Sequence, residues 1–151
     1  MEFSEVTKIY WENKDWEDLE KVKSVHDLYA VARRVLGRMP KPIVEVCGPI
    51  ATGGLDSREA NLNVFNDMIK KLQSEGLNVF DQIPFQKSMV GLIEKFSLEQ
   101  IREEMLNDFY LLIFKSGLIS TFYFLPNWQS SKGASWEHEK AKELGIQIVY
   151  L

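Results

Sequence analysis

Cysteine and histidine are almost missing from this sequence, and their scarcity removes two kinds of site. The 151 residues include one cysteine, Cys47, and two histidines, His26 and His138. A single cysteine excludes an internal disulfide and fits a reducing compartment. The three residues are far apart and show no metal-ligand spacing. We therefore expect neither a disulfide framework nor a bound metal.

Long apolar runs and an excess of basic charge are missing too. No apolar run approaches the roughly 18 residues that a membrane-spanning helix needs, and no basic-then-apolar leader opens the chain. The formal net charge is -4, whereas a surface that coats a nucleic acid needs clustered Lys and Arg. These absences predict a cytoplasmic protein that binds neither a membrane nor a nucleic-acid polymer. A small anionic ligand needs only local donors and stays open.

The length fits one domain with one core, preceded by a helical segment. Apolar residues recur at helical spacing over residues 15–37, and Pro40 and Pro42 punctuate the segment that follows. We expect residues 1–42 to form an N-terminal helical appendage and residues 43–151 to form the main α/β domain.

Strand and helix patterns alternate in the main domain. Strands are predicted at residues 43–47, 77–80, 118–125 and 146–150, with a helix between each pair of consecutive strands. This alternation predicts a doubly wound, flavodoxin- or Rossmann-like parallel sheet of four to five strands with flanking helices. In such sheets ligands bind beyond the carboxyl ends of the strands. Those ends are the loops at 48–56 and 126–133.

The first of these loops is rich in glycine. Gly48, Gly53 and Gly54 allow a ligand to approach the backbone, and the N-terminus of the following helix favours an anion. The loop is neither a dinucleotide-binding fingerprint nor a Walker loop. A tight turn without a ligand explains it equally well.

The second loop leads into a helix expected at 134–144, with Glu137 in its first turn. Small hydroxyl residues and a glycine at 128–134 are typical of a phosphate cradle. The positive end of the helix dipole would keep the Glu137 carboxylate ionised, as a nucleophile or base requires. In the alternative interpretation Ser131 only caps the helix and Glu137 only complements its dipole.

Together the two loops resemble a known superfamily. Residues 46–54 read VCGPIATGG and residues 125–145 read LPNWQSSKGASWEHEKAKELG. Both are similar to motifs of the nucleoside 2-deoxyribosyltransferase-like superfamily, in particular a phage and bacterial branch of largely unassigned function. Members cleave the N-glycosidic bond of nucleosides or nucleotides, by sugar transfer or hydrolysis. The resemblance, over about residues 43–151, implies that Glu137 attacks the anomeric carbon and forms a glycosyl-enzyme.

The resemblance also implies a substrate class. Transferases of free nucleosides tend to carry an acidic residue where this chain has Ser131. The 5′-monophosphate N-glycosidases have a serine there and a glycine two places on, matching Ser131 and Gly133. A hydroxyl and free N–H groups bind a phosphate that a carboxylate would repel. The expected ligand is a nucleoside 5′-monophosphate, with Gly48, Ile50 and Gly53 lining its sugar and phosphate side, no cofactor, and a homodimer as in many relatives.

Two positions depart from the superfamily pattern. Thr121 stands where an aspartate usually begins the third strand, and an ungapped match puts Ile113 at the place of a second aspartate. Asp108 can serve as the acid/base only if a bulge in its helix turns it inward. A non-catalytic nucleotide-binding module is therefore the alternative function, and an interaction protein with a vestigial pocket is a second one.

Four further side chains each have two interpretations. Asp81 contacts a base or ribose, or it is a turn residue. Trp128 stacks on a base, or it packs under the loop. Arg58 reaches a phosphate, or it is a surface charge. Cys47, in an apolar strand, is a buried and unreactive thiol, as we expect, or a reactive one.

Overall fold

The computed structural model describes residues 3–151 and is built on one sheet of four parallel strands. The strands are β1 Ile43–Cys47, β2 Asn78–Val79, β3 Ile119–Phe124 and β4 Gln147–Tyr150. Their spatial order is β2-β1-β3-β4, and every neighbouring pair is parallel. The predicted doubly wound α/β fold is confirmed, with four strands.

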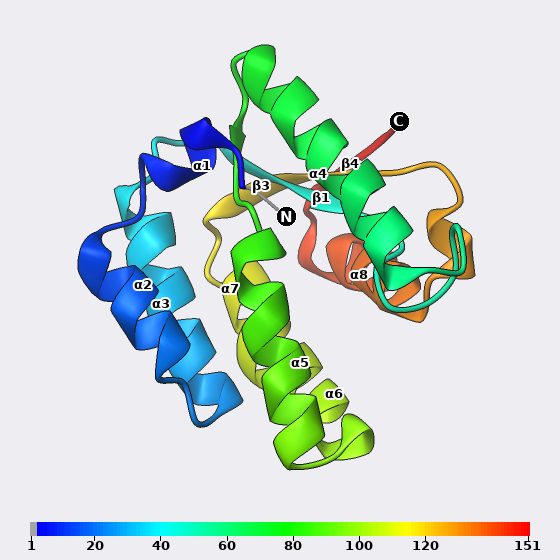
Figure 1. Cartoon of the computed structure of the whole chain (residues 1–151). Coiled ribbons are helices and arrows are strands. Elements are labelled where there is room, and N and C mark those ends of the chain that lie inside the picture. The colour runs from blue at the N-terminus through cyan, green and yellow to red at the C-terminus, as the bar shows by residue number, and fades with distance from the viewer. Residues whose placement is uncertain (1–2) are drawn as a thin grey trace.

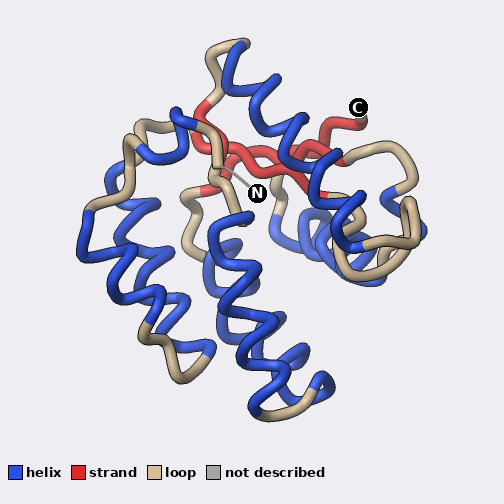
Figure 2. The backbone as a smooth tube through the Cα atoms, in the orientation of Figure 1, coloured by secondary structure: helices blue, strands red, loops and turns tan. Residues whose placement is uncertain are grey.

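Helices cover both faces of the sheet (Figures 1 and 2). They are α1 Glu5–Lys8, α2 Asn13–Glu20, α3 Val25–Arg38, α4 Arg58–Ser74, α5 Gln86–Lys95, α6 Leu98–Met105, α7 Leu111–Lys115 and α8 Lys132–Leu144. Two 3-10 turns, Ile83–Phe85 and Trp128–Ser130, and one π-helical turn, Leu106–Tyr110, complete the set. Figure 1 shows α4 on one side of the sheet, with α3 and α5 to α8 on the other.

Strand β1 divides its side chains between two hydrophobic clusters. Val44 and Val46 pack with residues of α4, whereas Ile43 and Cys47 pack in the larger cluster beneath the opposite face. This is the alternation that a pleated strand imposes. Glu45 shares the side of Ile43 and Cys47 and is 0% exposed, so a carboxyl group lies among apolar neighbours.

The N-terminal helices complete the larger cluster. The single helix predicted over residues 15–37 is wrong, because α2 ends at Glu20 and Ser24 caps a separate helix α3. Leu28 of α3 lies in the same buried cluster as Phe122 of β3. The core is therefore continuous across Pro42.

The segment after β2 is mostly helical. Pro84 lies in a 3-10 turn and Gly91 lies inside α5, although both residues are typical of loops. Proline is tolerated in a first helical turn, where its missing N–H has no partner to lose. Ser97 caps α6, since its Oγ accepts from the Gln100 N–H at 3.1 Å.

Ser57 caps the start of α4, where its Oγ accepts from the Ala60 N–H. Across residues 3–151, no helix combines the length and apolar character that crossing a bilayer demands.

Candidate active site at the carboxyl ends of β1 and β3

A pocket lies where the first and third strands end, at the point where the strand order reverses. Its cavity volume is about 240 Å³. The loop after β1 and the start of α8 form a polar wall, and α5 and α6 form an apolar wall that includes Met89, Ile93, Ile101 and Met105. Reversal points of this kind are where open α/β sheets bind ligands. The sequence-based prediction of the crevice matches this location.

Hydrogen bonds join the two loops that form the polar wall. The Gly54 N–H donates to Ser130 Oγ at 2.9 Å, and the Lys132 N–H donates to Thr52 Oγ1 at 3.1 Å. The side chain of Asn61, on α4, holds the first loop by donating to two of its carbonyls. The wall is therefore set by contacts between segments about 80 residues apart.

The glycines of the first loop have different roles. Gly48 and Ile50 line the pocket as predicted. Gly53 instead lies between the loops, outside the described residues that line the cavity. Its φ is +72°, and a Cβ there would lie 2.3 Å from the Ser130 carbonyl oxygen. Gly53 therefore does not line the pocket as predicted, and it lies at the junction of the two loops instead.

The start of α8 supplies both a helix cap and a lining surface. Ser131 Oγ accepts from the Ala134 N–H at 3.2 Å, so this hydroxyl caps the helix. Ser131 and Gly133 also line the pocket. The Gly133 N–H belongs to the first helical turn, where no acceptor within the helix is available. Ser131 therefore both caps α8 and lines the pocket, and the predicted phosphate contact stays a prediction.

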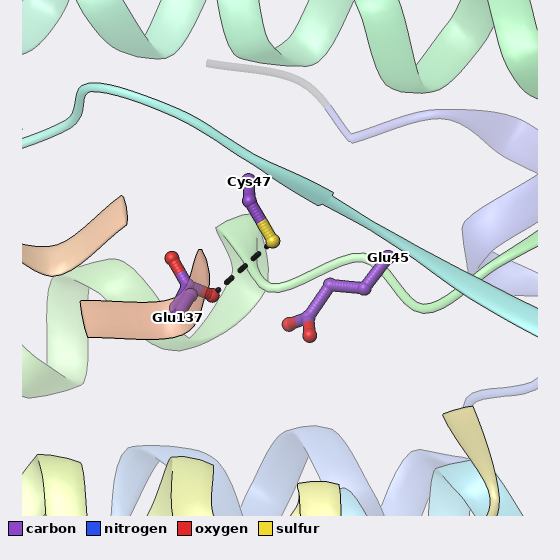
Figure 3. Close-up of side chains that lie close together, drawn as sticks. All are labelled: Glu45, Cys47 and Glu137. Carbon is purple, nitrogen blue, oxygen red and sulfur yellow. Dashed lines mark hydrogen bonds between the residues drawn. The ribbon is translucent and has the colours of Figure 1, made fainter. Parts of the chain in front are cut away.

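Glu137 reaches the pocket wall from the second turn of α8. The helix begins at Lys132, two residues earlier than predicted, which moves Glu137 one turn away from the N-terminus. Its carboxyl group is 8% exposed and accepts from Cys47 Sγ at 3.4 Å (Figure 3). Burial raises the pKa of Glu137 to about 8.

The expectation that the helix dipole keeps Glu137 ionised is therefore wrong at neutral pH. The dipole acts mainly within the first turn, whereas burial removes the water that stabilises a carboxylate. The same burial raises the pKa of the Cys47 thiol well above its ordinary value. The buried and unreactive thiol that the sequence suggests agrees with this environment.

Glu45 is a second buried carboxyl group that sequence reasoning missed. One ligating atom each from Glu45, Cys47 and Glu137 lie within 4.8 Å of one another. Burial, and after it the charge of Glu137, raises the pKa of Glu45 well above the usual range. The signal in the sequence was a charged residue inside the apolar strand at 43–47.

A spacing this close also suits a small cation in principle. Glu45 and Cys47 are both 0% exposed, however, and burial favours the neutral form of each. A hydrated ion needs an access path and must displace the protons of its ligands. These residues are therefore better suited to keeping their protons than to binding a metal ion.

A polar network continues the wall beside Glu137. The Tyr110 hydroxyl donates to Gln82 Oε1 at 2.8 Å, and Arg58 donates to Gln86 Oε1 at 2.6 Å. All four side chains line the pocket. Burial, with the charges of Glu137 and Glu45 nearby, raises the pKa of Tyr110 well above its usual value. Tyr110 is therefore a neutral hydrogen-bond donor at this wall, a role that no pattern in the sequence indicated.

Asp108 does not join the site. The π-helical turn at Leu106–Tyr110 is a bulge of the kind that could have turned it inward, but Asp108 is exposed and lies outside the described pocket lining. Tyr110 lines the pocket from the same turn instead. The position of Asp108 therefore contradicts its expected role as the acid/base. Ile113 is fully buried, and Thr121 donates to Gln147 at 3.4 Å, so neither supplies the missing carboxylate.

Comparison with known families gives one match. Residues 44–150 match the family described as Domain of unknown function (DUF4406). The chain belongs to this family. No curated protein and no solved structure matched. Every described residue that lines the pocket falls inside the DUF4406 domain.

The remaining candidates have structural roles in the DUF4406 domain. Asp81 is buried and accepts from Thr7 Oγ1 at 2.8 Å and from the Ile83 N–H at 2.9 Å. Trp128 stacks on His138, with 4.1 Å between ring centroids. Arg58 alone of the four undecided side chains lines the pocket. Thr7 lies before the matched residues, so the N-terminal segment is fastened to the DUF4406 domain through Asp81.

Proposed function

We propose that this DUF4406 domain cleaves the N-glycosidic bond of a nucleoside 5′-monophosphate, by hydrolysis or by transfer of the sugar, with Glu137 as the nucleophile. The observation that carries the proposal is the position of Glu137 in the wall of the pocket, beside Ser131 and Gly133. A carboxylate, a hydroxyl and backbone donors then face one cavity.

The reaction requires two balanced steps. A Glu137 oxygen forms a bond to the anomeric carbon while the bond from that carbon to the base nitrogen breaks. The base leaves with the bonding electrons and takes up a proton. Water, or the nitrogen of a second base, then displaces the carboxylate and gives up a proton. Splitting one difficult displacement into two is the general advantage of a covalent intermediate.

The lining of the pocket supports a phosphorylated nucleoside as the ligand. Three cationic side chains, Arg58, Arg102 and Lys132, line the cavity together with Ser131 and Gly133. Cations and N–H groups at a helix N-terminus favour a phosphate. The apolar wall from α5 and α6 suits the ring of a base, since ligand pockets combine apolar surface with a few polar groups.

A non-catalytic nucleotide-binding module of the same fold is the second candidate. Two observations favour it: the pKa of Glu137 is about 8, so most of this carboxyl is neutral at pH 7, and Asp108 lies outside the pocket lining. A neutral carboxyl does not attack carbon, but it does donate a hydrogen bond to a ligand.

Base release from a panel of ribo- and deoxyribonucleoside 5′-monophosphates and their unphosphorylated nucleosides tests the proposal. The assay is run at pH 7 and pH 9, with and without an added acceptor base, on the wild type, Glu137→Gln and Glu139→Gln. Glu139 is the exposed neighbour on α8 and serves as the matched control. We expect release that needs the phosphate, disappears in Glu137→Gln and persists in Glu139→Gln.

Binding separates the two candidates. A ligand that prefers the folded state raises the melting temperature. A raised melting temperature without base release under any condition would favour the binding module. We place either activity in the cytoplasm, where a reducing environment keeps the Cys47 thiol free.

A further inference from the structure

Glu45 is a carboxyl group that water does not reach. Its side chain is 0% exposed, and neither carboxyl oxygen has a hydrogen-bond partner among residues 3–151. It lies on the side of β1 that carries Ile43 and Cys47 into the larger hydrophobic cluster. An ionised carboxylate in such surroundings is strongly unfavourable, so the group neutralises instead. Glu45 therefore keeps its proton over a wide pH range.

The second carboxyl group of the site lies directly beside it. Figure 3 shows the side chains of Glu45 and Glu137 reaching the same space from β1 and α8. An oxygen of each and Cys47 Sγ lie within 4.8 Å of one another. Two carboxylates this close, with little water between them, do not both ionise readily, and they titrate as a pair.

The two carboxyl groups have unequal surroundings. Glu137 lines the pocket and accepts the thiol hydrogen bond of Cys47, whereas Glu45 has neither advantage. Among the other ionisable groups, Tyr110 of the π-helical turn lies near both carboxyl groups. Arg58 of α4, Arg102 of α6 and Lys132 of α8 line the same pocket. Tyr110 stays neutral and Arg58 stays cationic. The negative charge therefore settles on Glu137 first.

We propose that Glu45 and Glu137 are a coupled carboxyl pair, in which Glu137 is the member that ionises at the pocket while Glu45 keeps its proton. The catalytic meaning of this pair rests on the proposed function. Glu45 is a positioning residue that gives the nucleophile a neutral polar neighbour instead of a second charge. It does not line the pocket, so it acts only through Glu137.

Infrared spectra of the carboxyl groups test the pair without any substrate. The carbonyl band of a protonated carboxyl is followed from pH 5 to pH 10 in the wild type, Glu45→Gln, Glu45→Leu and Glu137→Gln. In the wild type we expect one protonated group to disappear near pH 8 and a second to persist above it. The second band should be missing in Glu45→Gln. In Glu137→Gln it should disappear at a lower pH than in the wild type, because the repelling charge is gone.

The two Glu45 variants separate a positioning role from simple space filling. Glutamine keeps a neutral dipole beside Glu137, and leucine keeps only the volume. We expect the Glu137 step to stay near pH 8 in Glu45→Gln and to rise by about one pH unit in Glu45→Leu, which means about tenfold less carboxylate at pH 7. If Glu137 ionised at the same pH in Glu45→Gln and in Glu45→Leu, the positioning role of Glu45 would be overturned.

Two further results would overturn the pair itself. One is a Glu45 band that disappears at the same pH in the wild type and in Glu137→Gln, since coupling is then absent. The other is a rise in melting temperature with zinc chloride that Glu45→Gln abolishes, since a cation then replaces the shared proton. If the pair titrates as expected but no base is released, only the proposed function fails.

Discussion

At the scale of single residues, burial decides which carboxyl group of this protein can carry a charge. Glu137 lies at the pocket wall, and the loss of water around it raises its pKa to about 8. Asp108 has the right chemistry but stays exposed on the other side of its helical turn. Burial at the pocket wall therefore distinguishes Glu137 from the exposed Asp108, a difference that the sequence alone does not show.

The pH dependence of catalysis should follow the ionisation of Glu137. Only the carboxylate attacks carbon, so kcat/KM for base release should rise about tenfold from pH 6 to pH 7 and level off above about pH 8. Steady-state rates on the best 5′-monophosphate of the panel measure this profile. A rate already constant from pH 6 upward would exclude Glu137, with its raised pKa, as the nucleophile.

Ser131 should control the preference for a phosphate. Ser131→Asp keeps a good helix cap but puts a negative charge at the pocket wall. We expect KM for the 5′-monophosphate to rise at least about tenfold, with little change for the free nucleoside. Ser135→Asp is the control, because it adds the same charge to the same helical turn at a residue outside the described lining. Equal effects of the two substitutions would contradict phosphate binding at Ser131.

At the scale of elements, the site depends on two loops that hold one another. The loop after β1 contacts the loop after β3 through backbone donors, and a side chain at Gly53 would clash with the backbone of Ser130. The hydrophobic pattern places both loops at the same edge of the sheet. It does not show that they touch, because the contact involves backbone atoms that no side-chain pattern records.

Gly53→Ala should loosen this junction. The residue has a φ of +72°, and its Cβ would meet the Ser130 carbonyl oxygen at 2.3 Å. Gly76→Ala is the matched control, because Gly76 has a φ of +91° with open space around it. We expect a loss of roughly 1 kcal/mol of unfolding free energy at Gly76 and at least about 2 kcal/mol at Gly53. Urea unfolding measures both, and equal losses would show that the loop contact is dispensable.

At the scale of the whole molecule, the buried carboxyl groups link stability to pH. The folded-state pKa of Glu137, about 8, lies above its ordinary value of 4.5, so the folded protein binds the proton more tightly. The resulting stabilisation is fully present below about pH 4.5 and is lost as pH rises through about 8.

Between these limits the free energy of unfolding should fall by roughly 4 kcal/mol more in the wild type than in Glu137→Gln. Glu45 should add to the loss at high pH, because burial also raises its pKa well above the usual range. Urea unfolding at one-unit pH intervals measures the slope, with Glu139→Gln as the control at an exposed site. Parallel curves for the wild type and Glu137→Gln would contradict the buried state of this carboxyl group.

The sequence by itself determined the alternating α/β fold, the two loops at the crevice and the lining by Gly48, Ile50, Ser131, Gly133 and Glu137. The fold and the place of the crevice follow from local periodicity and from the rule that parallel strands present their carboxyl ends together, whereas the lining residues came from the helix-start pattern and the family resemblance. Only the tertiary structure decided the charge states and the members of the site. It brought Glu45 and Cys47 beside Glu137, put Tyr110 in the wall and left Asp108 in solvent. The physical reason is that burial and proximity arise between segments far apart in the chain.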